Sequence, residues 1–70
     1  MILVYKTTVE TESEVAVLRP EIEVLKGIKN WNFDLEDCDR ILRIDCEFLL
    51  SERVISILKE KGFSCEELLY

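Results

Sequence analysis

The spacing of apolar residues changes between a two-residue and a three-to-four-residue period along the chain. The order of these changes constrains the fold more than any other feature. The first segment, residues 2–9, alternates, and one of its two sets consists of Leu3, Tyr5, Thr7 and Val9. A two-residue period places alternate side chains on opposite faces of a strand. Because the other set becomes polar toward its end, the first set is predicted to face the core.

The period changes at Thr11, which stands three residues before Glu14, the spacing of a capping box. In a capping box the hydroxyl and the carboxylate each accept a hydrogen bond from a backbone amide at the helix start. Apolar residues then recur at helical steps, namely Val15, Leu18, Ile22 and Leu25. Proline removes a backbone hydrogen bond, so Pro20 is predicted to bend or split this helix. Gly27 is predicted to end it.

Two further alternating segments follow, and a polar stretch separates them. Residues 30–36 place Trp31, Phe33 and Leu35 on one face. Residues 40–46 place Leu42, Ile44 and Cys46 on one face, with Ile41, Arg43 and Asp45 on the other. The polar residues 36–39 between them are typical of a turn. The pattern therefore predicts a β-hairpin.

The last part of the chain returns to a helical period. Ser51 is predicted to cap a second helix that buries Val54, Ile55 and Leu58 and ends at Gly62. Residues 63–68 are predicted to form a last, short edge strand. The element order βαββαβ is that of an α+β, ferredoxin-like sandwich: a four-stranded antiparallel sheet with two helices on one face. With 70 residues, the chain is predicted to be a single domain, 1–70.

Charge and composition disfavour several classes of function. A net charge of -6 disfavours nucleic acid and anionic membranes, because Lys and Arg drive binding to both. The chain has no His and only two Gly, which leaves no evident catalytic base and no glycine-rich phosphate loop, so no enzyme is predicted. Three widely spaced cysteines are not a disulfide framework. They are typical of a reducing compartment, and the cytoplasm is predicted.

Three stretches of the chain resemble the heavy-metal-associated domains, the small copper-chaperone family. These are Lys6-Thr7-Thr8-Val9 before the first helix, Trp31-Asn32-Phe33-Asp34-Leu35 in the second strand, and Lys61-Gly62-Phe63 before the last. The resemblance covers essentially the whole chain and implies the sheet order 4-1-3-2. It also implies a metal site of the form Cys-x-x-Cys at the start of the first helix.

Thr11 and Glu14 occupy the positions of those two cysteines. A hydroxyl and a carboxylate do not replace a thiolate pair, which soft ions such as Cu(I) require. The sequence therefore resembles the scaffold without its metal site, and no cofactor is predicted. The alternative is a heavy-metal site built differently, from the acidic loop with Glu10, Glu12 and Glu14 or from the cysteines Cys38, Cys46 and Cys65.

The sheet face that the helices leave open is the predicted contact surface. It should carry the apolar residues Ile2, Val4 and Ile41 beside the charged residues Lys6 and Arg43. An apolar patch with a charged rim is typical of a protein interface, either with a partner or with a second copy. The alternative is an ordinary solvated sheet, because a few exposed apolar residues are normal. A small-molecule regulatory module would rest on fold analogy alone.

Overall fold

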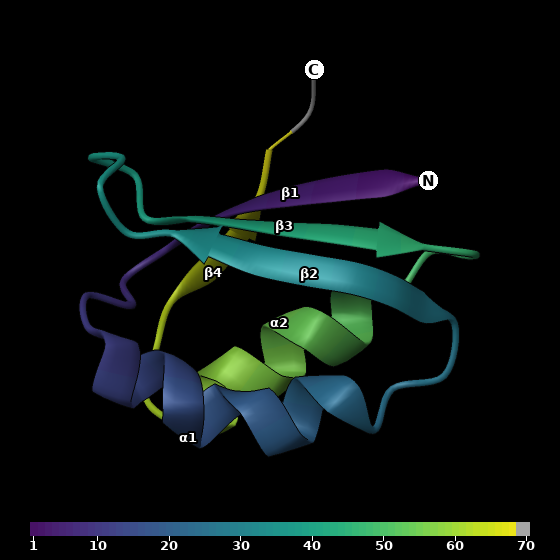
Figure 1. Cartoon of the computed structure of the whole chain (residues 1–70), viewed down its shortest axis with the longest axis horizontal. Helices are drawn as coiled ribbons and strands as arrows, with labels where there is room; N and C mark the ends of the chain where they lie inside the picture. Colours follow the sequence, from purple (N-terminus) through teal and green to yellow (C-terminus); the bar gives the residue numbers. More distant parts are fainter. Residues whose placement is uncertain (69–70) are drawn as a thin grey trace.

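The computed structural model describes residues 1–68, so the last two residues of the predicted domain lie outside the described part. Figure 1 shows the predicted order of strands and helices along the chain. The elements are β1 (Ile2–Thr7), α1 (Glu12–Glu23), β2 (Ile28–Asp34), β3 (Ile41–Cys46), α2 (Ser51–Glu60) and β4 (Cys65–Glu67).

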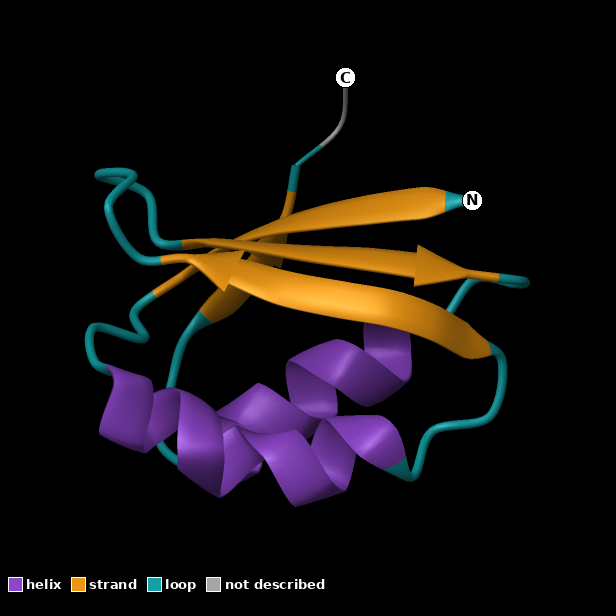
Figure 2. Cartoon of the chain, in the orientation of Figure 1, coloured by secondary structure: helices purple, strands orange, loops and turns teal. Residues whose placement is uncertain are grey.

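The four strands form one antiparallel sheet in the order β2-β3-β1-β4. Read from the other edge, this is the order 4-1-3-2 that the family resemblance implied. Figure 2 shows both helices on one side of the sheet, so within residues 1–68 no helix covers the other side, here called the open sheet face. The predicted ferredoxin-like sandwich is confirmed.

The core lies between the sheet and the two helices. In β1 the predicted inward set is correct, because Leu3, Tyr5 and Thr7 are buried and Val9 is buried just beyond the strand. In β3 the inward set Leu42, Ile44 and Cys46 is fully buried. The helices contribute Val15, Leu18 and Ile22 from α1 and Val54 and Leu58 from α2.

Helix α1 differs from the prediction in its second half. It is not split at Pro20, and it ends at Glu23 rather than near Gly27. Pro20 lies close to the end and is exposed, so the lost hydrogen bond affects one solvent-facing carbonyl. Leu25 N–H donates to Ile22 O (3.1 Å), which tightens the chain into a turn before Gly27 is reached. Gly27 instead has φ +92° in the connection to β2.

The hairpin forms as predicted, with β2 displaced toward the amino terminus. Strand β2 begins at Ile28, and its pairing with β3 skips Lys29, which forms a bulge. Trp31 and Phe33 pack against the core and meet edge to face, with ring centroids 6.1 Å apart. The Arg19 guanidinium of α1 lies 5.3 Å from the centroid of the Trp31 ring, so α1 covers the β2 edge of the sheet.

Ser51 does not cap α2, which corrects the prediction. Leu50 is the N-cap residue and makes no side-chain cap hydrogen bond. The Ser51 hydroxyl lies inside the fold, where it donates to the Glu67 carboxylate and shares a hydrogen bond of 3.0 Å with the Tyr5 hydroxyl. Because the only Ser51 proton points to Glu67, Tyr5 donates to Ser51. The side chain thus joins α2 to β1 and β4.

Candidate functional site

The β1–α1 turn contains Thr11 and Glu14, the two positions at which the family resemblance implied metal ligands. Thr11 Oγ1 accepts from Glu14 N–H (3.2 Å), and the Glu14 carboxylate accepts from Thr11 N–H (3.1 Å) and Glu10 N–H (2.8 Å). The predicted capping box is therefore present. Both side chains satisfy backbone donors at the helix start that would otherwise lack partners.

Two further loops meet this turn at the same end of the molecule, the left-hand end in Figure 1. Thr8 N–H donates to Ser64 O (3.3 Å), and Ser64 N–H donates to Thr8 Oγ1 (2.9 Å), which joins the α2–β4 loop. Thr7 N–H donates to Asp39 O (3.1 Å), and its hydroxyl donates to Arg40 O (2.6 Å), which joins the hairpin turn. The end is therefore held together by backbone and hydroxyl groups.

This arrangement does not fit a soft metal ion at the helix start. Thr11 and Glu14 offer one hydroxyl and one carboxylate, and both groups are engaged in hydrogen bonds to the backbone. Soft ions are bound by thiolate and thioether sulfur. The chemistry of these positions is helix capping.

Replacing Thr11 by alanine tests the capping box. The free energy of unfolding is expected to fall by about 1 kcal/mol, because one backbone donor loses its partner. Chemical denaturation of the variant, with Ser13→Ala in the same turn as a control, measures the change. An unfolding midpoint equal to that of the wild type would contradict the capping role.

The three cysteines do not come together as ligands. Cys46 is fully buried. It lies beside the start of β1, where its N–H donates to Met1 O (2.9 Å). Cys65 pairs with Thr7 at the other end of β1. At about 3.3 Å per residue the two ends of this strand lie far apart. Burial raises the pKa of the Cys65 thiol to about 12, with a smaller contribution from Glu67, so it remains protonated at neutral pH.

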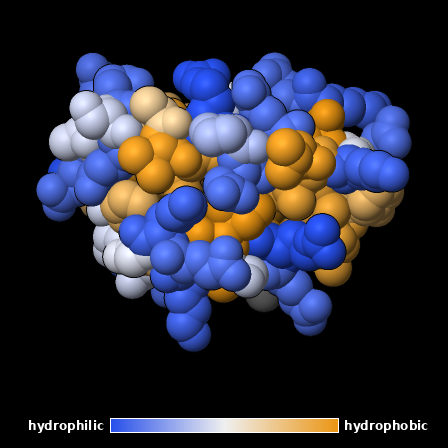
Figure 3. All heavy atoms as spheres, turned by 90° about the horizontal axis from the view of Figure 1, so that it is seen from below, coloured by the Kyte–Doolittle hydropathy of each residue, from blue (hydrophilic) through white to orange (hydrophobic). Residues whose placement is uncertain are grey.

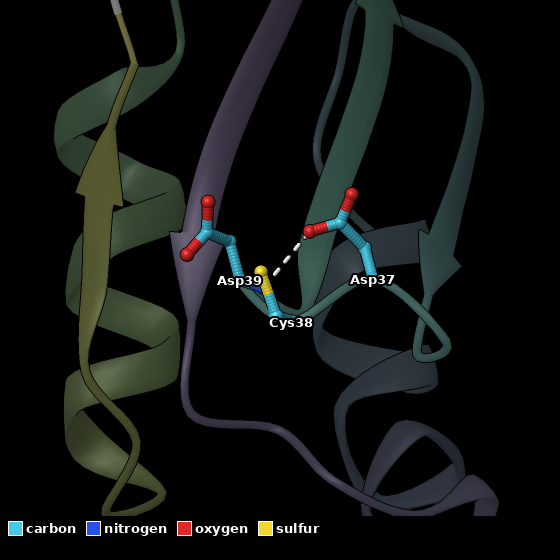
Figure 4. Close-up of side chains that lie close together, drawn as sticks. All are labelled: Asp37, Cys38 and Asp39. Carbon is cyan, nitrogen blue, oxygen red and sulfur yellow. Dashed lines mark hydrogen bonds between the residues drawn. The ribbon is translucent and has the colours of Figure 1, made fainter.

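Cys38 lies in the hairpin turn, where Asp37 and Asp39 flank it (Figure 4). The ligand atoms of these three residues lie within 4.8 Å of one another. The carboxylates already have partners, because Asp37 Oδ1 accepts from Asp39 N–H (2.8 Å) and Asp39 pairs with Lys6 (3.7 Å). A single exposed thiol between two paired carboxylates is a weak donor set for a soft ion.

The open sheet face contains the predicted contact residues, with one correction. Ile2 is 61% exposed, Val4 is half-buried, and Lys6 and Arg43 are exposed. Ile41, by contrast, is only 4% exposed. In the sheet Ile41 lies directly between Lys6 of β1 and Asp34 of β2, so cross-strand side chains flank it on both sides, and that of Lys6 is the longer one. It therefore presents almost no surface to a partner.

A shallow hollow of about 300 Å³ opens on this face. Ile2, Arg43 and Asp45 line it together with Asn30 and Asn32 of β2. Arg43 pairs with Asp34 (3.9 Å), and Asp45 pairs with the amino terminus (3.9 Å). The face is therefore an apolar strip along β1, rimmed by paired charges and by amides.

Sequence reasoning missed a second exposed apolar region, formed by Val24, Phe48 and Leu49. The signal was the run Phe48-Leu49-Leu50, which lies between predicted elements. Only Leu50 of this run is buried.

Comparison with known proteins supports the fold and leaves the function open. No family model and no curated protein matches the chain. The structure has the ferredoxin-like fold and the sheet order that the resemblance implied. It is similar to a solved structure of the yeast copper transporter domain CCC2A, described in apo and Cu(I)-loaded states. The TM-score is 0.81 at 14% sequence identity, and the match covers 97% of this chain and 94% of that one. At this identity the likeness establishes the fold alone.

Proposed function

We propose that this chain is a non-enzymatic binding module: a heavy-metal-associated fold that lacks the thiolate pair and acts through protein contact. It would work in a reducing compartment such as the cytoplasm. The three cysteines, all free, support this location. No helix within residues 1–68 is long and apolar enough to cross a bilayer.

The capping box is the observation on which the proposal depends. The neighbouring copper transporter domain has the same fold, yet here the two key positions are a hydroxyl and a carboxylate hydrogen-bonded to the backbone. Their arrangement is explained by helix capping without any ligand.

The open sheet face supports the contact role. Ile2 and Val4 form an apolar strip on β1, next to the hollow that Arg43 and Asp45 border. Many protein–protein interfaces have an apolar centre and a charged rim. Either a partner protein or a second copy would cover this face.

An anaerobic titration of the reduced protein with Cu(I) and Zn(II), against a chromophoric chelator, tests the proposal. The wild type is expected not to compete with the chelator. The double variant Thr11→Cys/Glu14→Cys is the matched control, because it restores two thiols at the helix start. This variant is expected to withdraw about one equivalent of Cu(I), since thiolates select that ion.

One tight equivalent on the wild type would contradict the proposal and favour the second candidate, metal binding at an altered site. That candidate is supported by the approach of Asp37, Cys38 and Asp39 to within 4.8 Å. The same titration of Cys38→Ser then locates the site. A loss of metal affinity in this variant places the site in the hairpin turn, whereas unchanged affinity leaves Cys46 or Cys65 as the thiolate. Unchanged affinity after all three cysteines are replaced by serine would exclude thiolate ligands and leave the acidic residues.

A further inference from the structure

The second apolar region lies at the end of the molecule opposite the capping box, where α1 ends and α2 begins (Figure 1). Val24, Phe48 and Leu49 are 74%, 49% and 65% exposed. Val24 and Phe48 border a hollow of about 410 Å³, here called the basic-flanked hollow, which is lined by Val24, Leu25, Lys26, Phe48, Leu50 and Arg53. Leu49 lines an adjoining hollow that shares Leu50 and Arg53 with it. Figure 3 views the molecule from the helix side and shows hydrophobic residues at the surface between hydrophilic ones.

Phe48 is held in place although it is half exposed. Its ring packs directly against Gly27, since a Cβ on Gly27 would lie 2.6 Å from Phe48 Cζ. Glu47 N–H donates to Gly27 O (2.8 Å), which fixes the backbone before the ring. An aromatic side chain positioned in advance loses little conformational entropy when a ligand covers it. Such residues are typical anchors of protein interfaces.

The charged residues that line the hollow have the sign opposite to the net charge of the chain. The net charge is -6, yet both charged residues that line the hollow, Lys26 and Arg53, are basic. Neither forms an ion pair with the residues that the structure describes, whereas Lys6, Arg19, Arg43 and Lys61 do. Two exposed cations beside an apolar hollow complement a ligand that combines carboxylates with apolar side chains.

We propose that the basic-flanked hollow binds an acidic amphipathic segment of a partner protein. Aromatic or aliphatic side chains of that segment pack on Val24, Phe48 and Leu49, and its carboxylates meet Lys26 and Arg53. This surface is distinct from the open sheet face, so the inference does not depend on the proposed function.

Selection from a random peptide library displayed on phage, with the reduced wild-type protein as target, tests the inference. The enriched peptides are expected to combine Asp or Glu with Phe, Leu or Trp. A synthetic representative is expected to bind the variant Lys26→Glu/Arg53→Glu at least about tenfold more weakly, because two attractions become two repulsions. The same peptide is expected to lose affinity for Val24→Ser/Leu49→Ser.

The matched control is Lys59→Glu/Lys61→Glu, which makes the same change in net charge at the other end of α2. It is expected to leave the affinity within about twofold, since exposed charges far from a site are screened by salt. Circular dichroism checks that every variant is folded.

Several results would overturn the inference. These are the absence of enriched peptides, enrichment of neutral or basic sequences, and equal loss of affinity in the control variant. The peptide will also shift backbone amide NMR signals of the protein. If the shifted signals belong to Ile2 and Val4, the peptide binds the open sheet face and not the hollow. Self-association abolished by Val24→Ser/Leu49→Ser would assign the hollow to a second copy of the chain instead.

Discussion

Replacing Gly27 by alanine is expected to lower the free energy of unfolding by about 2–3 kcal/mol. Gly27 has φ +92°, a backbone conformation that costs a residue with a Cβ roughly 1–2 kcal/mol. The added methyl group would also lie 2.6 Å from Phe48 Cζ, so the ring has to move. Alanine also lowers the conformational entropy of the unfolded chain, and this offsets roughly 0.4–1 kcal/mol of the loss in stability.

Gly62 provides the matched control. Its φ is +90°, but nothing lies within 4 Å of the position that its Cβ would occupy. Gly62→Ala is therefore expected to show the backbone cost alone, about 1 kcal/mol. Denaturant unfolding of both variants measures the difference, which reports the packing of Phe48 on Gly27.

A third variant, Gly27→Ala/Phe48→Ala, separates the two contributions at Gly27. With the ring removed, the alanine at position 27 is expected to cost no more than the alanine at position 62. Equal losses in Gly27→Ala and Gly62→Ala would contradict the view that Gly27 positions Phe48. That result would also weaken the case for Phe48 as an anchor positioned in advance.

Ser51→Ala is expected to lower the free energy of unfolding by about 1–3 kcal/mol. The Tyr5 side chain is fully buried, and its hydroxyl donates to Ser51 over 3.0 Å. Removing the serine oxygen leaves that hydroxyl without a partner and removes the hydrogen bond to Glu67. A buried polar group without a hydrogen bond costs more than the bond itself contributes.

Tyr5→Phe is the control for this pair. The double variant Tyr5→Phe/Ser51→Ala is expected to lose less stability than the sum of the two single variants, because it leaves no orphaned tyrosine hydroxyl. Losses that add within experimental error would contradict the coupling. Thermal or denaturant unfolding near neutral pH measures all three variants.

The same network predicts how stability depends on alkaline pH. Burial raises the pKa of Tyr5 from 10.0 to about 12, against the opposing effect of the Ser51 hydrogen bond. The unfolded chain therefore releases the tyrosine proton first as pH rises. Stability is expected to be unaffected by this group below about pH 10 and to fall between about pH 10 and 12. In a Cys65→Ser background, which removes the other raised pKa, Tyr5→Phe is expected to flatten this fall.

The period of the apolar residues was enough to predict the order of the elements. The inward sets of β1 and β3 were correct because a strand with one buried face has its register set by that face. The capping box at Thr11 and Glu14 was also readable, since it involves residues three apart in one turn. Such patterns are local, and neighbouring residues are enough to specify them.

The errors concern residues whose environment is made by distant segments. Ser51 is a residue type that commonly caps helices, yet its hydroxyl is hydrogen-bonded to Tyr5 of β1 and Glu67 of β4. Ile41 has the outward position of its strand, yet it is buried between the cross-strand neighbours Lys6 and Asp34.

For the candidate sites the same division holds. That positions 11 and 14 hold no thiolate pair could be read directly from the sequence, because Thr11 and Glu14 contain no sulfur at any geometry. The basic-flanked hollow could not, because it forms only when the end of α1 and the loop before α2 meet across Gly27. Residue identity and local spacing thus determine the elements and the chemistry that is absent, whereas burial and surface shape depend on contacts between segments far apart in the chain.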